Sequence, residues 1–231
     1  SVVLILTAIG IFMLTKIAVW YRKQLEEEKL AKVKKVLVSS LPPLTKKQVG
    51  IALSLLLVII FARSFYVTNI TNFYVFYLIQ EYGLTIEKGQ LLIFLFMAFG
   101  VVGTFFGGSL SDRIGRKNVI LLSVVVPIPL CLALPYVPLW LVVILLIVIG
   151  SLIMISFSVT VVYAQELVPT KIGTMAGLTV GLAFGMGAIG SVLIGMLMDK
   201  IGIETTMMII SALPILMLVA LALPRDQVAK G

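Results

Sequence analysis

Residues 107–118, GGSLSDRIGRKN, form a short polar stretch that decides how this chain folds. The apolar segments on either side of it, residues 91–110 and 118–136, contain no charged residue. Each segment is about as long as the roughly 20 residues that a helix needs to cross a bilayer. We therefore interpret the stretch as a tight turn between two membrane-spanning helices, in which Gly115 permits the sharp change of direction because it lacks a Cβ.

The charges of this turn indicate the side of the membrane on which it lies. Asp112 ends the first helix, and three basic residues follow it, namely Arg113, Arg116 and Lys117. Lys and Arg are retained in cytoplasmic loops. If the turn is cytoplasmic, the same side carries fourteen of the eighteen Lys and Arg residues, and the opposite side carries only Lys88 and Lys200. We therefore expect a multi-pass protein of the cell membrane with its C-terminus in the cytoplasm.

The composition excludes a soluble protein and an enzyme built on common catalytic groups. The 231 residues are 61% hydrophobic and 12% charged, whereas a soluble domain is about 25% charged. The net charge of +8 is concentrated in a few loops, which indicates membrane topology and not nucleic-acid binding. The chain has no histidine, and its single cysteine, Cys131, lies in an apolar segment. We expect no metal site, no cofactor, no disulfide framework and no enzymatic activity.

The apolar segments predict an all-α polytopic membrane protein with seven transmembrane helices. The first span is residues 2–20, and the other six lie near residues 49–78, 91–110, 118–136, 138–163, 173–198 and 206–223. Residues 21–47 hold eight Lys and Arg residues, with Leu and Val at helical spacing between them. This pattern predicts an amphipathic helix on the cytoplasmic membrane surface. We expect three parts: the last helix of a preceding half (residues 1–20), a linker (21–47) and a six-helix bundle (48–231).

A weak internal repeat relates the two halves of the six-helix bundle. Phe99-Gly100 leads into Gly108-x-x-x-Asp112-x-x-Gly115, and Phe184-Gly185 leads into Gly195-x-x-x-Asp199-x-x-Gly202. The predicted topology places the end of the first copy at the cytoplasm and the end of the second copy at the outer side. Two three-helix units of opposite orientation would produce this arrangement, which is common in transporters. A chance match of abundant glycines is the alternative.

The polar turn carries a resemblance to a known family. Its pattern, Gly108-x-x-x-Asp112-Arg113-x-Gly115-Arg116-Lys117, resembles the signature of the major facilitator superfamily of secondary transporters. The resemblance implies that this chain is the later part of a twelve-helix protein, from its sixth helix onward. It also implies that the turn takes part in gating, and that the helix following the linker lines a central cavity.

A second run, Tyr163-x-x-Glu166-x-x-Pro169, is similar to the end of the corresponding superfamily helix. This similarity implies that Glu166 pairs with Arg113 or Arg116. Residues 164–169 and 183–187 resemble the fosmidomycin-resistance branch of the drug antiporters. That branch implies proton-coupled efflux of a small molecule.

Arg63 is the charged residue that lies deepest in a predicted span. Burying an arginine in a membrane costs several kcal/mol, so its default interpretation is functional. At about 100° per residue, Tyr66, Ile70, Tyr74 and Tyr77 share its helix face. A guanidinium favours an anion. We expect the substrate to bind at Arg63, Tyr66, Asn69, Tyr74 and Tyr77. The alternative is a structural arginine, paired with backbone carbonyls or with a carboxylate of the preceding half.

Two further features concern the walls of the predicted cavity. Residues 68–72, TNITN, are poor helix formers, and an unbroken helix over this region would exceed the bilayer thickness. We therefore expect a helix break near Asn69. Four hydroxyl residues make the fifth of the seven spans, residues 138–163, a second candidate wall, namely Ser151, Ser156, Ser158 and Thr160.

Three functions remain open at this point. The first is a secondary active transporter that exports a small molecule, with protons as the coupling ion. The second is an uptake facilitator or symporter for a sugar or organic anion, and the third is a membrane receptor that does not transport. The carboxylates of Glu81, Glu87 and Asp199 lie near the outer ends of the spans, so we expect the proton carrier in the preceding half. The expected partners are the substrate, protons, lipids and that preceding half, and we expect no nucleic acid.

Overall fold

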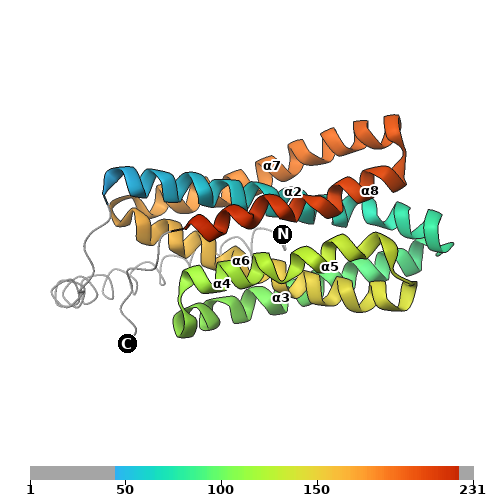
Figure 1. Cartoon of the computed structure of the whole chain (residues 1–231), viewed down its shortest axis with the longest axis horizontal. Helices are drawn as coiled ribbons and strands as arrows, with labels where there is room; N and C mark the ends of the chain where they lie inside the picture. Colours follow the sequence, from blue (N-terminus) through green and yellow to red (C-terminus); the bar gives the residue numbers. More distant parts are fainter. Residues whose placement is uncertain (1–44, 224–231) are drawn as a thin grey trace, which may run out of the picture. The chain divides into compact units, whose positions relative to one another are not determined.

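A computed structural model of the protein describes residues 45–223, and nearly all of them are helical. The elements are α2 (Lys46–Tyr82), α3 (Ile86–Ile114), α4 (Arg116–Val125), α5 (Pro127–Ala133), η1 (Leu134–Tyr136), α6 (Leu139–Leu167), η2 (Pro169–Lys171), α7 (Ile172–Ile201), α8 (Ile203–Ala212) and η3 (Leu213–Ala222). Figure 1 shows how they are arranged. The predicted first span and all but the last three residues of the predicted linker lie outside the described residues.

The six predicted spans of the bundle are confirmed. Six helical segments of the described part are long and apolar enough to cross a membrane, and they cover Lys47–Tyr82, Ile86–Ile114, Arg116–Tyr136, Leu139–Leu167, Pro169–Ile201 and Ile203–Ala222. They extend beyond the predicted bounds by several residues at most ends. The extensions contain the polar and charged residues that hydropathy alone assigns to loops.

The third and sixth of these six spans are divided where prolines occur. The third span changes from α4 to α5 at Pro127, and the sixth changes from α8 to the 3-10 helix η3 one residue before Pro214. Both prolines are buried. A proline has no N–H to donate to the preceding turn, so an α-helix is interrupted or bent where it occurs.

The predicted break near Asn69 is wrong, because α2 is one unbroken helix of 37 residues. Asn69 Nδ2 donates to the carbonyl oxygen of Phe65 at 2.7 Å, and Thr71 Oγ1 donates to the carbonyl oxygens of Val67 and Thr68 at 3.0 Å. These side chains donate hydrogen bonds to carbonyl oxygens of the preceding turn, so their donors have partners and the helix continues in an apolar environment. At 1.5 Å per residue α2 is about 55 Å long, and it therefore extends beyond a hydrocarbon core of about 30 Å.

Two helix pairs, α3 with α6 and α2 with α7, pack most closely in the bundle. Figure 1 shows the members of each pair running side by side. A Cβ added at Gly103 would lie 2.0 Å from the carbonyl oxygen of Ser151, and one added at Gly107 would lie 2.4 Å from that of Ile155. Small residues let helix backbones approach this closely in membranes. The backbones of α3 and α6 are therefore in direct contact.

The glycines that recur every four residues in the first half of α7 make no close helix contact within the described part. Nothing in the described part lies within 4 Å of a Cβ added at any of these four glycines, which are Gly173, Gly177, Gly181 and Gly185. The close contacts of α7 with α2 lie instead at Gly187 and Gly190, which face Thr68 and Phe65.

The internal repeat has a matching backbone at its two junctions. Gly115 between α3 and α4 has φ 92° and ψ 151°, and Gly202 between α7 and α8 has φ 81° and ψ 166°. Each glycine donates its N–H four residues back, at 3.0 Å, and the next helix begins at the following residue. Only glycine adopts this region of φ and ψ readily. The two copies therefore share a local structure as well as a pattern of letters.

Candidate functional site

Arg116 is the centre of a charged cluster at the junction between α3 and α4. Its Nη1 lies 2.7 Å from Asp112 Oδ1, and its Nη2 and Nε lie 3.2 and 3.3 Å from Glu166 Oε1. Nη1 also donates to Ser111 Oγ. The side chain of Arg116 is 16% exposed, and those of Asp112 and Glu166 are 69% and 35% exposed. One guanidinium thus joins the end of α3, the start of α4 and the end of α6.

The neighbouring basic residues differ in their contacts. Glu166 pairs with Arg116, one of the two alternatives that the sequence left open, while the exposed Arg113 forms no ion pair with any described residue. Lys117 Nζ donates to the carbonyl oxygens of Leu221 and Leu223 at the end of η3, the first of them at 3.5 Å. A cation at the C-terminal end of a helix bonds the last carbonyls and is favoured by the helix dipole.

Gly108, the first glycine of the signature, has open space around it, since no described atom lies within 4 Å of an added Cβ. It therefore contributes no close helix contact inside this bundle. The contacts that need glycine on α3 lie at other positions, on the side that faces α6.

Arg63 lies between α2 and α6 and is 3% exposed. Its Nη1 donates to Thr160 Oγ1 at 3.3 Å and to Ser156 Oγ at 3.5 Å. The carbon Cζ of the guanidinium lies 5.0 Å from the centre of the Phe157 ring, which is within the range of a cation–π interaction. None of the described carboxylates forms an ion pair with Arg63. The contacts of the guanidinium in the described part are thus all with neutral groups of α6.

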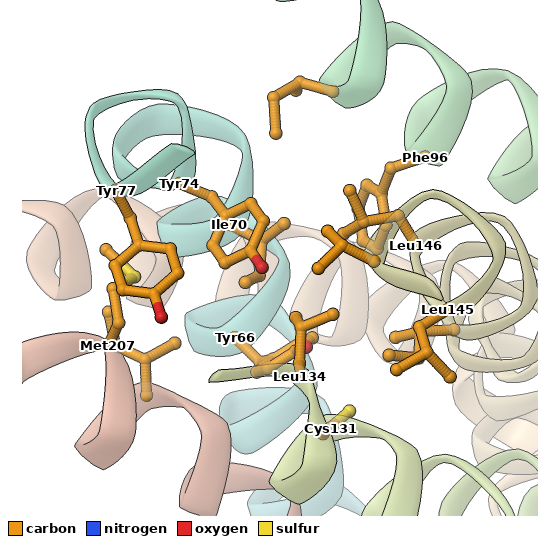
Figure 2. Close-up of a cluster of buried hydrophobic side chains, with 14 of the residues drawn as sticks. Tyr66, Ile70, Tyr74, Tyr77, Phe96, Cys131, Leu134, Leu145, Leu146 and Met207 are labelled. Atoms are coloured by element: carbon orange, nitrogen blue, oxygen red, sulfur yellow. The ribbon is translucent and has the colours of Figure 1, made fainter. Parts of the chain in front are cut away.

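The tyrosines predicted beside Arg63 point into the interior of the bundle. Tyr66, Tyr74 and Tyr77 are at most 2% exposed and belong to one apolar cluster. Figure 2 shows their rings projecting from α2 into this cluster, which Cys131, Leu134 and Met207 also enter. The shared helix face is therefore present, but in the structure it is covered by α5, η1 and α8.

The polar atoms of this face are satisfied to different degrees. Tyr77 Oη donates to the carbonyl oxygen of Pro135 at 3.2 Å. By contrast, Tyr66 Oη, Asn69 Oδ1 and Tyr74 Oη are buried without a hydrogen-bond partner among the described residues. Buried polar atoms normally have a partner, so each such atom needs an explanation. No group of three or more metal-ligating side chains occurs in the part of the chain that the structure describes.

Comparison with known proteins identifies the family. The sequence model of the Major Facilitator Superfamily matches residues 1–180. The chain belongs to the Major Facilitator Superfamily. This result confirms the resemblance drawn from the polar turn, and the all-helical bundle agrees with it.

Two curated relatives are similar to this superfamily member. The uncharacterized MFS-type transporter YfnC of Bacillus subtilis (strain 168) is 48% identical over 225 residues, which cover 96% of this chain and 54% of that protein. The fosmidomycin resistance protein of Escherichia coli (strain K12) is 38% identical over 219 residues, covering 95% of this chain and 53% of that protein. The chain thus spans about half the length of these relatives. No solved structure matches it.

Three contacts of this superfamily member were not anticipated from its sequence. They are the contact of Lys117 with the end of η3, the ring of Phe157 over Arg63, and the glycine contacts between α3 and α6. The residues of the first pair are 104 positions apart, so no local pattern connects them. The glycines at 100, 103 and 107 were a detectable signal, because their spacing places them on one side of α3.

Proposed function

We propose that the full-length protein that contains this chain is a secondary active transporter that exports a small molecule in exchange for protons. Superfamily membership and the six membrane-length helices support transport as the activity. One relative is named as an MFS-type transporter, and the other is named for resistance to fosmidomycin. Resistance is a natural consequence of export, which is why we favour export over uptake.

The observation that carries this proposal is the charged cluster around Arg116. It connects three helices through two ion pairs whose carboxylates are 69% and 35% exposed. Exposed ion pairs contribute about 0–1 kcal/mol each, so they can break and form again at little cost. A cluster of this kind suits alternating access, in which a junction holds helices in one state and releases them in another.

The proposed orientation places this cluster on the cytoplasmic side of the cell membrane. The contact of Arg116 with Glu166 and that of Lys117 with the end of η3 bring three chain segments to one end of the bundle. Arg113, Arg116 and Lys117 all lie there, whereas Lys88 and Lys200 lie near the other ends of α3 and α7. The positive-inside rule supports a cytoplasmic location for the more basic end.

Accumulation of fosmidomycin in bacterial cells tests the proposal. Cells that express the full-length protein should hold less of the compound than cells that carry an empty vector. A protonophore, which removes the proton gradient, should abolish the difference. Equal accumulation in both strains would remove fosmidomycin as a substrate, and a difference that survives the protonophore would argue against proton coupling.

A further inference from the structure

The guanidinium of Arg63 is held on one side only. Nη1 has two N–H groups, and these face Thr160 Oγ1 and Ser156 Oγ. The other three N–H groups, on Nε and Nη2, have no hydrogen-bond acceptor among the described residues. Nε–H and Nη2–H point in parallel, and this edge of arginine accepts the two oxygens of a carboxylate or phosphate. The edge of the Arg63 guanidinium that fits an oxyanion is therefore the edge that forms no hydrogen bond with the described residues.

The two hydroxyls beside Arg63 are neutral and do not compensate its positive charge. Ser156 Oγ donates to the carbonyl oxygen of Ile153 at 2.9 Å, and Thr160 Oγ1 donates to that of Ser156 at 2.8 Å. Each hydroxyl thus gives its proton to α6 and offers a lone pair to Nη1. Neutral acceptors orient the guanidinium but do not neutralise it, and a buried charge normally requires an opposite charge. All ten acidic residues of the chain lie near or beyond the ends of the spans.

Phe157 covers the guanidinium. Its ring lies over Cζ of Arg63 at 5.0 Å, and unlike Arg63 it is partly exposed. On α2, the partly exposed side chains of Ser64, Val67 and Thr71 lie between the side that contacts α6 and the side that contacts α7. Displacement of the Phe157 ring would remove one of the groups that cover the guanidinium.

We propose that Arg63, beneath Phe157, is an oxyanion-binding site between α2 and α6. Its ligands are small carboxylates, phosphonates or phosphates, which accept two hydrogen bonds from Nε and Nη2. Ser156 and Thr160 are positioning residues that fix the guanidinium through Nη1, and Phe157 is a displaceable cover. The inference rests on the proposed transport function and names its substrate class as anionic.

A carboxylate from the part of the protein outside this chain has the same chemistry and could occupy the same edge of Arg63. The two sources predict different behaviour. A substrate site binds added anions with an affinity that depends on Arg63. A carboxylate of the protein itself would already fill the site, and then Arg63 would affect only the stability of the fold.

The test is titration calorimetry on the purified full-length protein with benzoate and phenylphosphonate as probes, and with neutral benzamide as the matched control ligand. Arg63→Gln should weaken binding of both anions at least tenfold, because it removes two charge-assisted hydrogen bonds. Arg63→Lys should have an intermediate effect, since it keeps the charge and loses the parallel pair of donors. Phe157→Ala should bind the anions several-fold more tightly, because the ring no longer competes for the cation.

Two control variants and one independent assay make the outcome decisive. Lys47→Gln removes a charge from an exposed end of α2, and Phe105→Ala removes a ring that is 79% exposed; both should bind the probes as the wild type does. Unchanged anion affinity in Arg63→Gln together with lower thermal stability would overturn the proposal in favour of an internal carboxylate. Tighter binding in Phe157→Ala cannot result from misfolding. Proton-driven flux of an anionic compound that is unchanged by Arg63→Gln would overturn the anion site and leave the transport function intact.

Discussion

Gly103→Ala tests the closest helix contact in the bundle. The added Cβ would lie 2.0 Å from the carbonyl oxygen of Ser151 and 2.8 Å from its carbonyl carbon. Ordinary contacts of a Cβ begin at 3.4 Å, so α3 and α6 must separate by more than an ångström at this point. Both clashing atoms belong to the backbone of α6 and cannot rotate away. The whole helix pair must therefore adjust.

The expected loss of stability follows from this geometry. Overpacking of a well-packed interior costs about 1–3 kcal/mol, and alanine recovers up to about 1 kcal/mol through its higher helix propensity. Gly108→Ala is the matched control, because it lies on the same helix and its added Cβ meets no described atom within 4 Å. It should be neutral or slightly stabilising.

Thermal unfolding of the purified full-length protein in detergent measures the difference. A change of 1 kcal/mol shifts the midpoint of a domain of this size by about 2–4 °C. We expect the midpoint of Gly103→Ala to lie roughly 3–10 °C below that of Gly108→Ala on this scale. Equal midpoints for the two variants would refute the direct backbone contact between α3 and α6.

Two other predictions concern the polar turn. Asp112→Asn should slow transport several-fold while the amount of folded, membrane-inserted protein stays the same, because one of the two carboxylates on Arg116 is lost; flux in vesicles beside quantitative immunoblotting tests this, and wild-type turnover would contradict it. Lys117→Gln should increase amide hydrogen exchange near the end of η3, because it removes the cation that bonds the carbonyls of Leu221 and Leu223. Arg113→Gln removes the same charge from a residue without a contact to η3 and should leave that exchange unchanged. Equal exchange in the two variants would contradict a stabilising contact of Lys117 with the end of η3.

Much of the fold was predictable because membrane helices follow from local composition. Long apolar runs give the six spans, and the turn at Gly115 follows from a glycine among charges between two such runs. The break expected at Asn69 was wrong for a physical reason. Propensity scales measure how polar residues behave in water, whereas in α2 the side chain of Asn69 bonds to the carbonyl oxygen of Phe65 and stays within the helix.

The candidate site was predictable only in part. Arg63 stands out because a charge inside a span is rare, and Glu166 was correctly matched to a basic residue of the turn. The contacts of Arg63 with Ser156, Thr160 and Phe157 join residues more than 90 positions apart. They depend on how α2 rotates against α6, which helical periodicity within α2 alone does not determine. For the same reason, the shared face of Tyr66 and Tyr77 was correct while its burial beneath α5 and α8 was not anticipated.

Proton-coupled flux in proteoliposomes is the most direct test of the proposed function. The full-length protein is reconstituted with a pH indicator inside the vesicles, and a candidate anionic substrate is supplied under an imposed pH gradient. Proton-coupled export predicts that net substrate flux is opposite to the proton flux and that reversing the pH gradient reverses its direction. Substrate flux of the same direction and rate under both gradients, with no change in internal pH, would contradict it.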